Sequence, residues 1–303
     1  MRFSLAVSSA ALLGFALSSF AQGPAISPGG VVGAASGTSL VGIFGTPLAS
    51  GLAPHATVPM ATITSGGIVP IYSNVPTIQS GEWVSIYGTN LSGTGQNATW
   101  NGDFPTSLGS TSVTINGKLA YLWYVSPTQI NLQAPQDTAT GTVTVVVTTP
   151  AGSAMSSVTL APFGPSFSLL DAKHVAGIIL RSDGSGAFGG GTYDIVGPTG
   201  TSLGYKTVAA KAGDSVVLFA VGLGPTNPVV PPGAPFTGAA ATTNPVVVQI
   251  NNVPVTLGFA GMSSAGLYQI NLTLPSNLGT GDVSLQAMVG GVQTPSGPVI
   301  SLQ

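Results

Sequence analysis

Short apolar runs that alternate with polar residues dominate the chain from about residue 67 onward. Between Thr142 and Val147, valine occupies every second position, and threonine fills most of the positions between. A period of two with β-branched residues is typical of strands that bury one face. Such runs recur roughly every ten residues, as expected for a β-sandwich. No helical period stands out, so we predict an all-β protein.

Four blocks of this pattern occur twice, in the same order. Gaps between the copies fall where loops are expected, and each copy spans roughly 90 residues, the size of one small sandwich. The duplication predicts two tandem domains, which we place at 67–163 and 164–303. The paired blocks are 80–91 with 212–223, 113–117 with 248–252, 129–135 with 269–275, and 141–145 with 281–285.

The first copy carries a recognisable set of motifs. Val-Ser-Ile-Tyr-Gly-Thr-Asn-Leu at 84–91 follows an acidic turn, and Val-Thr-Ile-Asn-Gly at 113–117 and Gly-Thr-Val-Thr-Val at 141–145 come later. These elements resemble IPT/TIG domains, an immunoglobulin-like family. The second copy matches less well, with Ala-Val-Gly at 220–222 where the first has Gly-Thr-Asn.

The whole of 67–303 also resembles a paired C-terminal module of exported acidobacterial (Solibacter-type) proteins. The two resemblances imply tandem immunoglobulin-like (IPT/TIG-like) β-sandwich domains in an extracellular setting. They bring no established catalytic residues.

The N-terminal residues 1–21 have the features of a cleaved secretory signal peptide. Arg2 supplies a positive start, 5–17 is apolar, and Ser19-Phe20-Ala21 offers small residues for cleavage. The alternative is a membrane anchor, but the apolar run is shorter than the about 20 residues that a span requires. Residues 22–66 form a Gly/Ala/Pro-rich lead-in. We therefore predict a secreted or cell-surface protein.

Charge is unusually scarce and excludes several classes of function. Only 5% of the 303 residues are charged, whereas an average domain has about 25%. The six basic residues are scattered, so no patch can neutralise phosphates, and nucleic-acid binding is excluded. With no cysteine and two histidines, a zinc site is not expected. We predict no cofactor and no metal.

Catalytic candidates are few. Asp171 and His174 are close in sequence, but no serine lies in a Gly-x-Ser-x-Gly elbow to complete a triad. Glu82 and Asp214 occupy the same turn in the two copies, which favours a scaffold role through turn hydrogen bonds. The glycine-rich stretch 183–194 has only two carboxylates, too few for a strong calcium site. We predict no catalytic residue.

The copies differ most at one strand. Leu122 and Tyr124 align with Leu257 and Phe259, and we predict that these four residues lie in the cores. The other predicted core residues are Val84, Ile86, Ile115, Ile130, Leu132, Val143 and Val145 in the first copy, and Val216, Leu218, Ile250, Ile270, Leu272, Val283 and Leu285 in the second. On the opposite face, the first copy has Tyr121 and Trp123 where the second has Thr256 and Gly258. Exposed aromatics suit sugar rings or a partner's apolar surface. If a ligand site exists, we therefore expect Tyr121 and Trp123 to belong to it. The alternative is that the lead-in or the second domain covers them.

These observations favour a non-catalytic extracellular or cell-surface interaction or structural module, acting in adhesion or surface architecture. One alternative is a carbohydrate-binding protein that uses exposed aromatics. Another is a hydrolase with an unrecognised site. The expected partners are surface glycans or other extracellular proteins.

Overall fold

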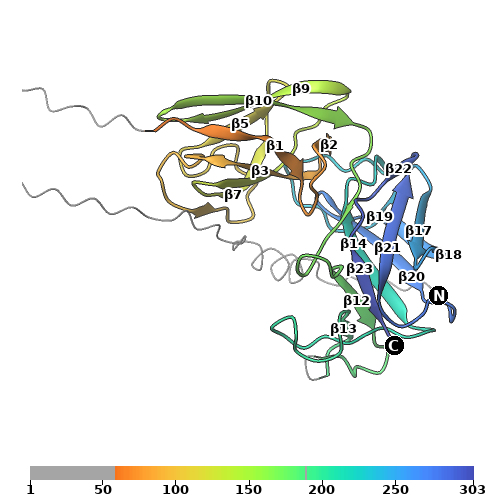
Figure 1. Ribbon diagram of the computed structural model, residues 1–303. Coiled ribbons are helices and arrows are strands. Elements are labelled where there is room, and N and C mark those ends of the chain that lie inside the picture. The colour runs from red at the N-terminus through yellow and green to blue at the C-terminus, as the bar shows by residue number, and fades with distance from the viewer. Residues whose placement is uncertain (1–58, 188–189) are drawn as a thin grey trace, which may run out of the picture.

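The computed structural model describes residues 59–187 and 190–303, and every regular element in these ranges is a strand. The predicted signal peptide and residues 22–58 of the predicted lead-in lie outside the described residues. Strand β1 begins at Thr62, so the last residues of the range predicted as lead-in pair within the first sandwich. Figure 1 shows two groups of strands side by side, β1–β10 and β11–β23.

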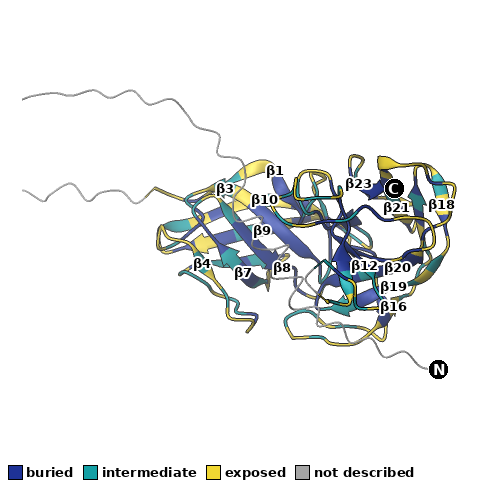
Figure 2. Ribbon diagram, turned by 90° about the horizontal axis from the view of Figure 1, so that it is seen from below, coloured by how far each residue is buried: buried dark blue, intermediate teal, exposed yellow. Residues whose placement is uncertain are grey.

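The first group forms a sandwich of two five-stranded sheets, with orders β1-β3-β8-β7-β4 and β2-β10-β9-β5-β6. Burial follows the predicted period of two in β9, and Figure 2 shows buried and exposed residues along the strands of this sandwich. The strands are β1 (Thr62–Pro70), β2 (Thr77–Gln79), β3 (Trp83–Thr89), β4 (Ala98–Thr99), β5 (Ser112–Ile115), β6 (Lys118–Leu119), β7 (Tyr121–Val125), β8 (Gln129–Gln133), β9 (Gly141–Thr149) and β10 (Gly152–Ala161).

The second group repeats this plan with additions on one sheet. Its larger sheet has the order β13-β12-β14-β20-β19-β16-β15, with β11 also pairing with β14. The facing sheet has the order β18-β17-β21-β22, and β23 also pairs with β21. The strands are β11 (Ser166–Phe167), β12 (Gly177–Leu180), β13 (Tyr193–Ile195), β14 (Ser215–Val221), β15 (Thr226–Asn227), β16 (Ala240–Thr242), β17 (Val246–Ile250), β18 (Val253–Val255), β19 (Leu257–Ser264), β20 (Leu267–Thr273), β21 (Gly281–Val289), β22 (Val292–Gln293) and β23 (Val299–Leu302).

Strand register repeats along with the sequence. Val84 of β3 pairs with Leu132 of β8, and the equivalent Val216 pairs with Leu272. In the facing sheets, β5 pairs with β9 in the same register as β17 pairs with β21. A shift of one residue would turn every side chain to the other face, so equal registers place equivalent residues in equivalent cores.

Most predicted core residues lie in the two cores. In the second domain, Leu257 is only half-buried but packs against the core. The confirmed core residues are Val84, Ile86, Ile115, Leu122, Ile130, Leu132, Val143 and Val145 in the first domain, and Val216, Leu218, Ile250, Ile270, Leu272, Val283 and Leu285 in the second.

The prediction that Tyr124 lies in the first core is wrong, and a β-bulge in β7 explains why. Leu122 pairs with Leu132, but the next pair joins Tyr124 to Asn131, so Trp123 is an extra residue in β7. The extra residue shifts the inward face by one position. Val125 is therefore fully buried in the core, and Tyr124 is half-buried outside it.

The second copy contains the same bulge at the same place. Leu257 pairs with Leu272 and Phe259 with Asn271, which leaves Gly258 as the extra residue. The prediction that Phe259 lies in the second core is wrong for the same reason. Ala260 takes the inward position and packs against the core.

Candidate functional site

An aromatic cluster fills the junction between the two sandwiches. We call it the junction cluster; its buried members come from both domains, and further rings pack at its border. Trp83 is central: its ring centroid lies 5.8 Å from that of Trp100, 6.4 Å from that of Phe104 and 6.0 Å from that of Trp123. The buried members are Ile71, Trp83, Phe104, Trp123, Val221 and Ala265, and the border residues are Tyr72, Trp100, Tyr121, Tyr124 and Phe236.

The predicted ligand residues Tyr121 and Trp123 both belong to this cluster. Trp123 is 7% exposed, and Tyr121 is half-buried. The Tyr121 ring lies where a side chain on Gly233 would point, and Gly233 also has a positive φ of 81°. The structure thus has the arrangement we gave as the alternative, in which the second domain covers these aromatics. Ligand binding by them stays a prediction.

Hydrogen bonds from first-domain side chains to second-domain backbone hold the junction. The Trp83 indole Nε1 donates to the Ala265 carbonyl at 2.8 Å. Gln133 accepts from the Gly233 amide at 2.9 Å through Oε1. These polar atoms are removed from water, so each requires its partner across the junction.

Gln79 lies at the start of the turn between β2 and β3 and connects this turn to β20 of the second domain. Its Oε1 accepts from the Gly224 amide at 2.7 Å, and its Nε2 donates to the Tyr268 hydroxyl at 3.3 Å. That hydroxyl in turn donates to the Gly224 carbonyl. Burial raises the pKa of the Tyr268 phenol, which keeps the hydroxyl protonated as a donor.

Glu82 lies in this turn and is 1% exposed. Its Oε2 accepts from the Gln79 amide at 2.7 Å, whereas its Oε1 has no hydrogen-bond partner. The carboxyl group lies against two backbone segments: a Cβ on Gly222 would overlap it, and one on Gly164 would crowd it. Burial raises the pKa of Glu82 well above its usual range, and the Gln79 bond offsets this only in part.

The equivalent turn of the second domain holds Asp214 differently. Its Oδ2 accepts from the Lys211 amide at 2.9 Å, which reproduces the bond from Gln79 to Glu82. The predicted turn role of the two carboxylates is therefore confirmed. The other oxygen of Asp214 accepts from Arg181, whose Nε also bonds Asp194 at 2.7 Å.

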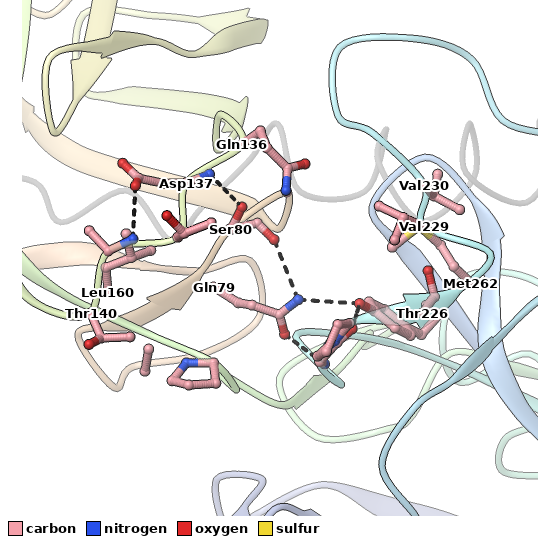
Figure 3. Close-up of a pocket in the computed structure, with 18 residues that line it drawn as sticks. Gln79, Ser80, Gln136, Asp137, Thr140, Leu160, Thr226, Val229, Val230 and Met262 are labelled. Atoms are coloured by element: carbon pink, nitrogen blue, oxygen red, sulfur yellow. Dashed lines mark hydrogen bonds between the residues drawn. The ribbon is translucent and has the colours of Figure 1, made fainter.

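A cavity of about 360 Å³ opens beside the junction (Figure 3). Its walls come from the turn at Gln79, the 136–140 loop, the end of β10 and the 224–230 loop of the second domain. Leu160, Val229 and Met262 supply apolar surface. The carboxylate in the wall, Asp137, is neutralised by Lys118 at 3.2 Å. The lining thus combines apolar side chains with amides and hydroxyls.

Asp171 and His174, which are close in sequence, are in contact, and both belong to a group of ion pairs that also includes Asp282. His174 Nδ1 lies 2.8 Å from Asp171, and Nε2 lies 3.1 Å from Asp282. Asp282 also bonds Lys173 and Ser301, and these partners lower its pKa to about 2. With both imidazole nitrogens facing carboxylates, the group ties the 171–174 loop to β21 rather than presenting a free base.

The glycine-rich stretch 183–194 makes no carboxylate cluster. Asp183 bonds the Ser185 amide in its own turn, and Asp194 bonds Arg181. In the two ranges that the structure describes, no group of three or more His, Asp or Glu is arranged to hold a metal ion.

The sequence analysis missed Gln79, Trp83 and Gln133 as junction residues. Their partners lie at least 100 positions away in the chain, beyond the reach of local patterns. One signal was available at Trp83, because the duplicate position is Ser215. A large aromatic on an outward position of one copy alone indicates a surface that the other copy does not need.

Comparison with known families confirms the resemblance in the first domain. Residues 67–161 match the model of the IPT/TIG domain family. This segment is thus an IPT/TIG domain, and the protein consists of tandem immunoglobulin-like sandwiches across the described residues. No curated protein matches the sequence. The resemblance to exported acidobacterial modules stays a prediction.

Several solved structures show a distant similarity to this chain. The extracellular region of plexin A4 is 14% identical over 85% of this chain and 20% of its own, with a TM-score of 0.28. The SGBP-B protein of a Bacteroides ovatus mixed-linkage glucan utilization locus, solved with a heptasaccharide, is 12% identical over 75% of this chain and 43% of its own, at 0.30. A tandem pair of titin immunoglobulin domains is 11% identical over 75% and 91%, at 0.20.

This chain spans less than half of the plexin and SGBP-B chains, and all three TM-scores are below 0.5. These likenesses therefore carry no argument about function. No helix in the described part of the chain is both long and apolar enough to cross a membrane.

Proposed function

We propose that this protein is a non-catalytic module of the cell surface or extracellular space, in which two immunoglobulin-like sandwiches are held in a fixed orientation for adhesion or surface architecture. The observation that carries the proposal is the junction. Trp83 is buried between the domains and hydrogen-bonded to Ala265, and Gln79 and Gln133 bond second-domain backbone on either side.

A fixed junction supports an architectural role. Domains within one chain move relative to each other unless their interface is large and apolar. Here the interface contains five aromatic rings of the first domain, linked by pairwise ring contacts, and several buried hydrogen bonds between the domains. A rigid pair presents its outer surfaces at a set distance and angle, which is useful for bridging a partner and a cell.

Several titratable side chains are already bonded to other groups of the protein, which supports the non-catalytic part of the proposal. Catalysis requires acids, bases or nucleophiles that converge on a free position in a cleft. Here Glu82 and Asp214 bond turn amides, and the two imidazole nitrogens of His174 bond Asp171 and Asp282. Because charge is scarce, binding to surface glycans or extracellular proteins should depend only weakly on salt.

Fractionation of the producing cells into cytosol, envelope, matrix and medium tests the location. We expect the protein outside the cytosol, with a mature N-terminus after Ala21. The purified protein should also give no turnover in a broad screen of ester, glycoside and peptide substrates. Retention in the cytosol would contradict the location, and saturable turnover would contradict the non-catalytic role.

A second candidate is glycan binding at the border of the junction cluster, with Tyr121 and Trp123 as the proposed ligand residues. It is favoured by the half-buried rings of Trp100, Tyr121 and Tyr124, which leave part of their surface open. A glycan array with wild type, Tyr121→Ala and Tyr87→Ala tests it. Tyr87 is an exposed tyrosine outside the cluster and serves as the matched control. Loss of binding in Tyr121→Ala alone supports this candidate, and no binding by wild type removes it.

A further inference from the structure

We propose that Glu82 is a proton-dependent latch between the two domains: the junction is closed while its carboxyl group is protonated and opens when that group ionises. The starting point is an unusual position. Glu82 is the only glutamate in the chain, and its side chain is fully buried between the first domain, the connecting segment at Gly164 and the second domain at Gly222.

The hydrogen bonds of Glu82 fit a neutral carboxyl group. Oε2 has one donor, the Gln79 amide, and Oε1 has none. An ionised carboxylate in a protein interior needs several donors or a cation to replace its hydration. Within the described residues, Glu82 takes part in no ion pair, whereas Asp194 and Asp214 share Arg181.

The surroundings of Oε1 add to this preference. A Cβ on Gly222 would overlap both Oε1 and the Gly164 carbonyl oxygen, so the two oxygens flank the same small space. A protonated carboxyl group brings no net charge to this space. An ionised Oε1 faces an oxygen of like partial charge, which pushes the connecting segment away.

Other titratable groups at the junction do not offset the charge. The Tyr268 phenol on β20 lies near Glu82, and the Tyr72 phenol is buried after β1. Burial raises the pKa of both phenols, so they are neutral wherever Glu82 titrates. Lys118, Lys173 and Arg181 pair with aspartates elsewhere. Because Glu82 is covered by the segments at Gly164 and Gly222, hydration of the ionised carboxylate would require these segments to move away from it.

Opening would change what the protein presents. Gln79 lies three residues before Glu82 and joins the first domain to Gly224 and Tyr268. Displacing this turn breaks those bonds and exposes the buried face of Trp83. A rise in pH through the pKa of Glu82 would thus convert a rigid pair into two hinged domains with an exposed aromatic surface.

Distance measurement between the domains tests the latch. The chain has no cysteine, so Ser157→Cys and Ser284→Cys, both at exposed strand positions, allow specific spin labelling of one domain each. At acid pH we expect one narrow distance. As pH rises, a second and broader distance should replace it, whereas a labelled protein that also carries Glu82→Gln should keep the single distance at every pH.

Carbon-13 labelling of glutamate gives an independent measurement on the unmodified chain, because its one δ-carboxyl resonance belongs to Glu82. The resonance should titrate well above the ordinary glutamate range and at the pH where the distance changes. Titration in the ordinary range would overturn the latch. So would titration without a change in distance, or the same change in Glu82→Gln.

Discussion

The same acidic turn occurs in both domains, but the second oxygen of its carboxylate has a partner in one domain and none in the other. In each copy a carboxylate accepts from the amide three residues before it. Asp214 gives its second oxygen to Arg181, within its own domain. Glu82 turns its second oxygen toward the other domain and finds no donor there. A duplicated turn thus keeps its local hydrogen bond while its remaining surface is adapted to a different neighbour.

The largest expected effect comes from the outward position next to this turn, where the first copy has Trp83 and the second has Ser215. Trp83→Ala removes a buried ring and its bond to Ala265 and should lower the free energy of unfolding by about 3–5 kcal/mol. The exposed Ser215→Ala should change it by less than about 0.5 kcal/mol. Denaturant unfolding followed by circular dichroism measures both. Equal effects would mean that the junction contributes no stability.

Core positions, in contrast, should behave alike in both copies. Ile130 and Ile270 are fully buried, align in the duplication and face equivalent partners across their sheets. Substitution of either by alanine should cost about 2–5 kcal/mol. Because all three tryptophans lie in the first domain, fluorescence separates its unfolding from the signal of the whole chain. A loss below about 0.5 kcal/mol at both sites would contradict the core assignment.

The third effect is on the pH dependence of stability. The folded-state pKa of Glu82 lies above the unfolded value, so its contribution is full below about pH 4 and is lost as pH rises toward the folded-state pKa. The slope is about 1.4 kcal/mol per pH unit within that window. Glu82→Gln should abolish this slope. The matched variant Asp214→Asn weakens the contact with Arg181 and should lower stability at neutral pH. Melting temperatures of the two variants and the wild type, measured from pH 4 to 9, test both expectations.

The smallest effect is at acid pH and belongs to the second domain. Lys173 and Ser301 lower the pKa of Asp282 to about 2, so its stabilisation is present above the unfolded value near 4 and is lost as pH falls toward 2. After allowance for solvent screening, about 1 kcal/mol is at stake. In Asp282→Asn, acid unfolding between pH 4 and 2 should be shallower than in wild type. If the variant and the wild type lose stability equally between pH 4 and 2, this ion pair adds no stability.

The fold was predictable because its signals are local and repeated. Alternation in segments such as 141–145 gave the inward residues, and the two copies supplied independent readings of one register. The family resemblance rested on the same segments. The bulge at Trp123 was not predictable, because Leu122, Trp123 and Tyr124 are all large and apolar. A one-residue shift leaves such a run looking unchanged.

The junction was less predictable, because it depends on contacts between distant parts of the chain. Tyr121 and Trp123, which differ from Thr256 and Gly258 in the second copy, lie in the junction cluster. This sequence difference did not indicate whether a ligand or a domain contacts them. The difference between Trp83 and Ser215 carried the same information and points to the same face. Glu82 was assigned to the turn correctly, but nothing in the sequence indicated that its other oxygen is buried.

The bulge and the neighbouring turn together limit how a chain of such domains can grow. A tandem array of identical joints requires each module to present the same contact surface to the module that follows it. The first module offers the indoles of Trp83 and Trp123 and the carboxyl group of Glu82. At the corresponding places the second has the exposed Ser215, the exposed Gly258 and an aspartate already bound to Arg181. A third module could therefore not dock on the second sandwich through the same set of contacts.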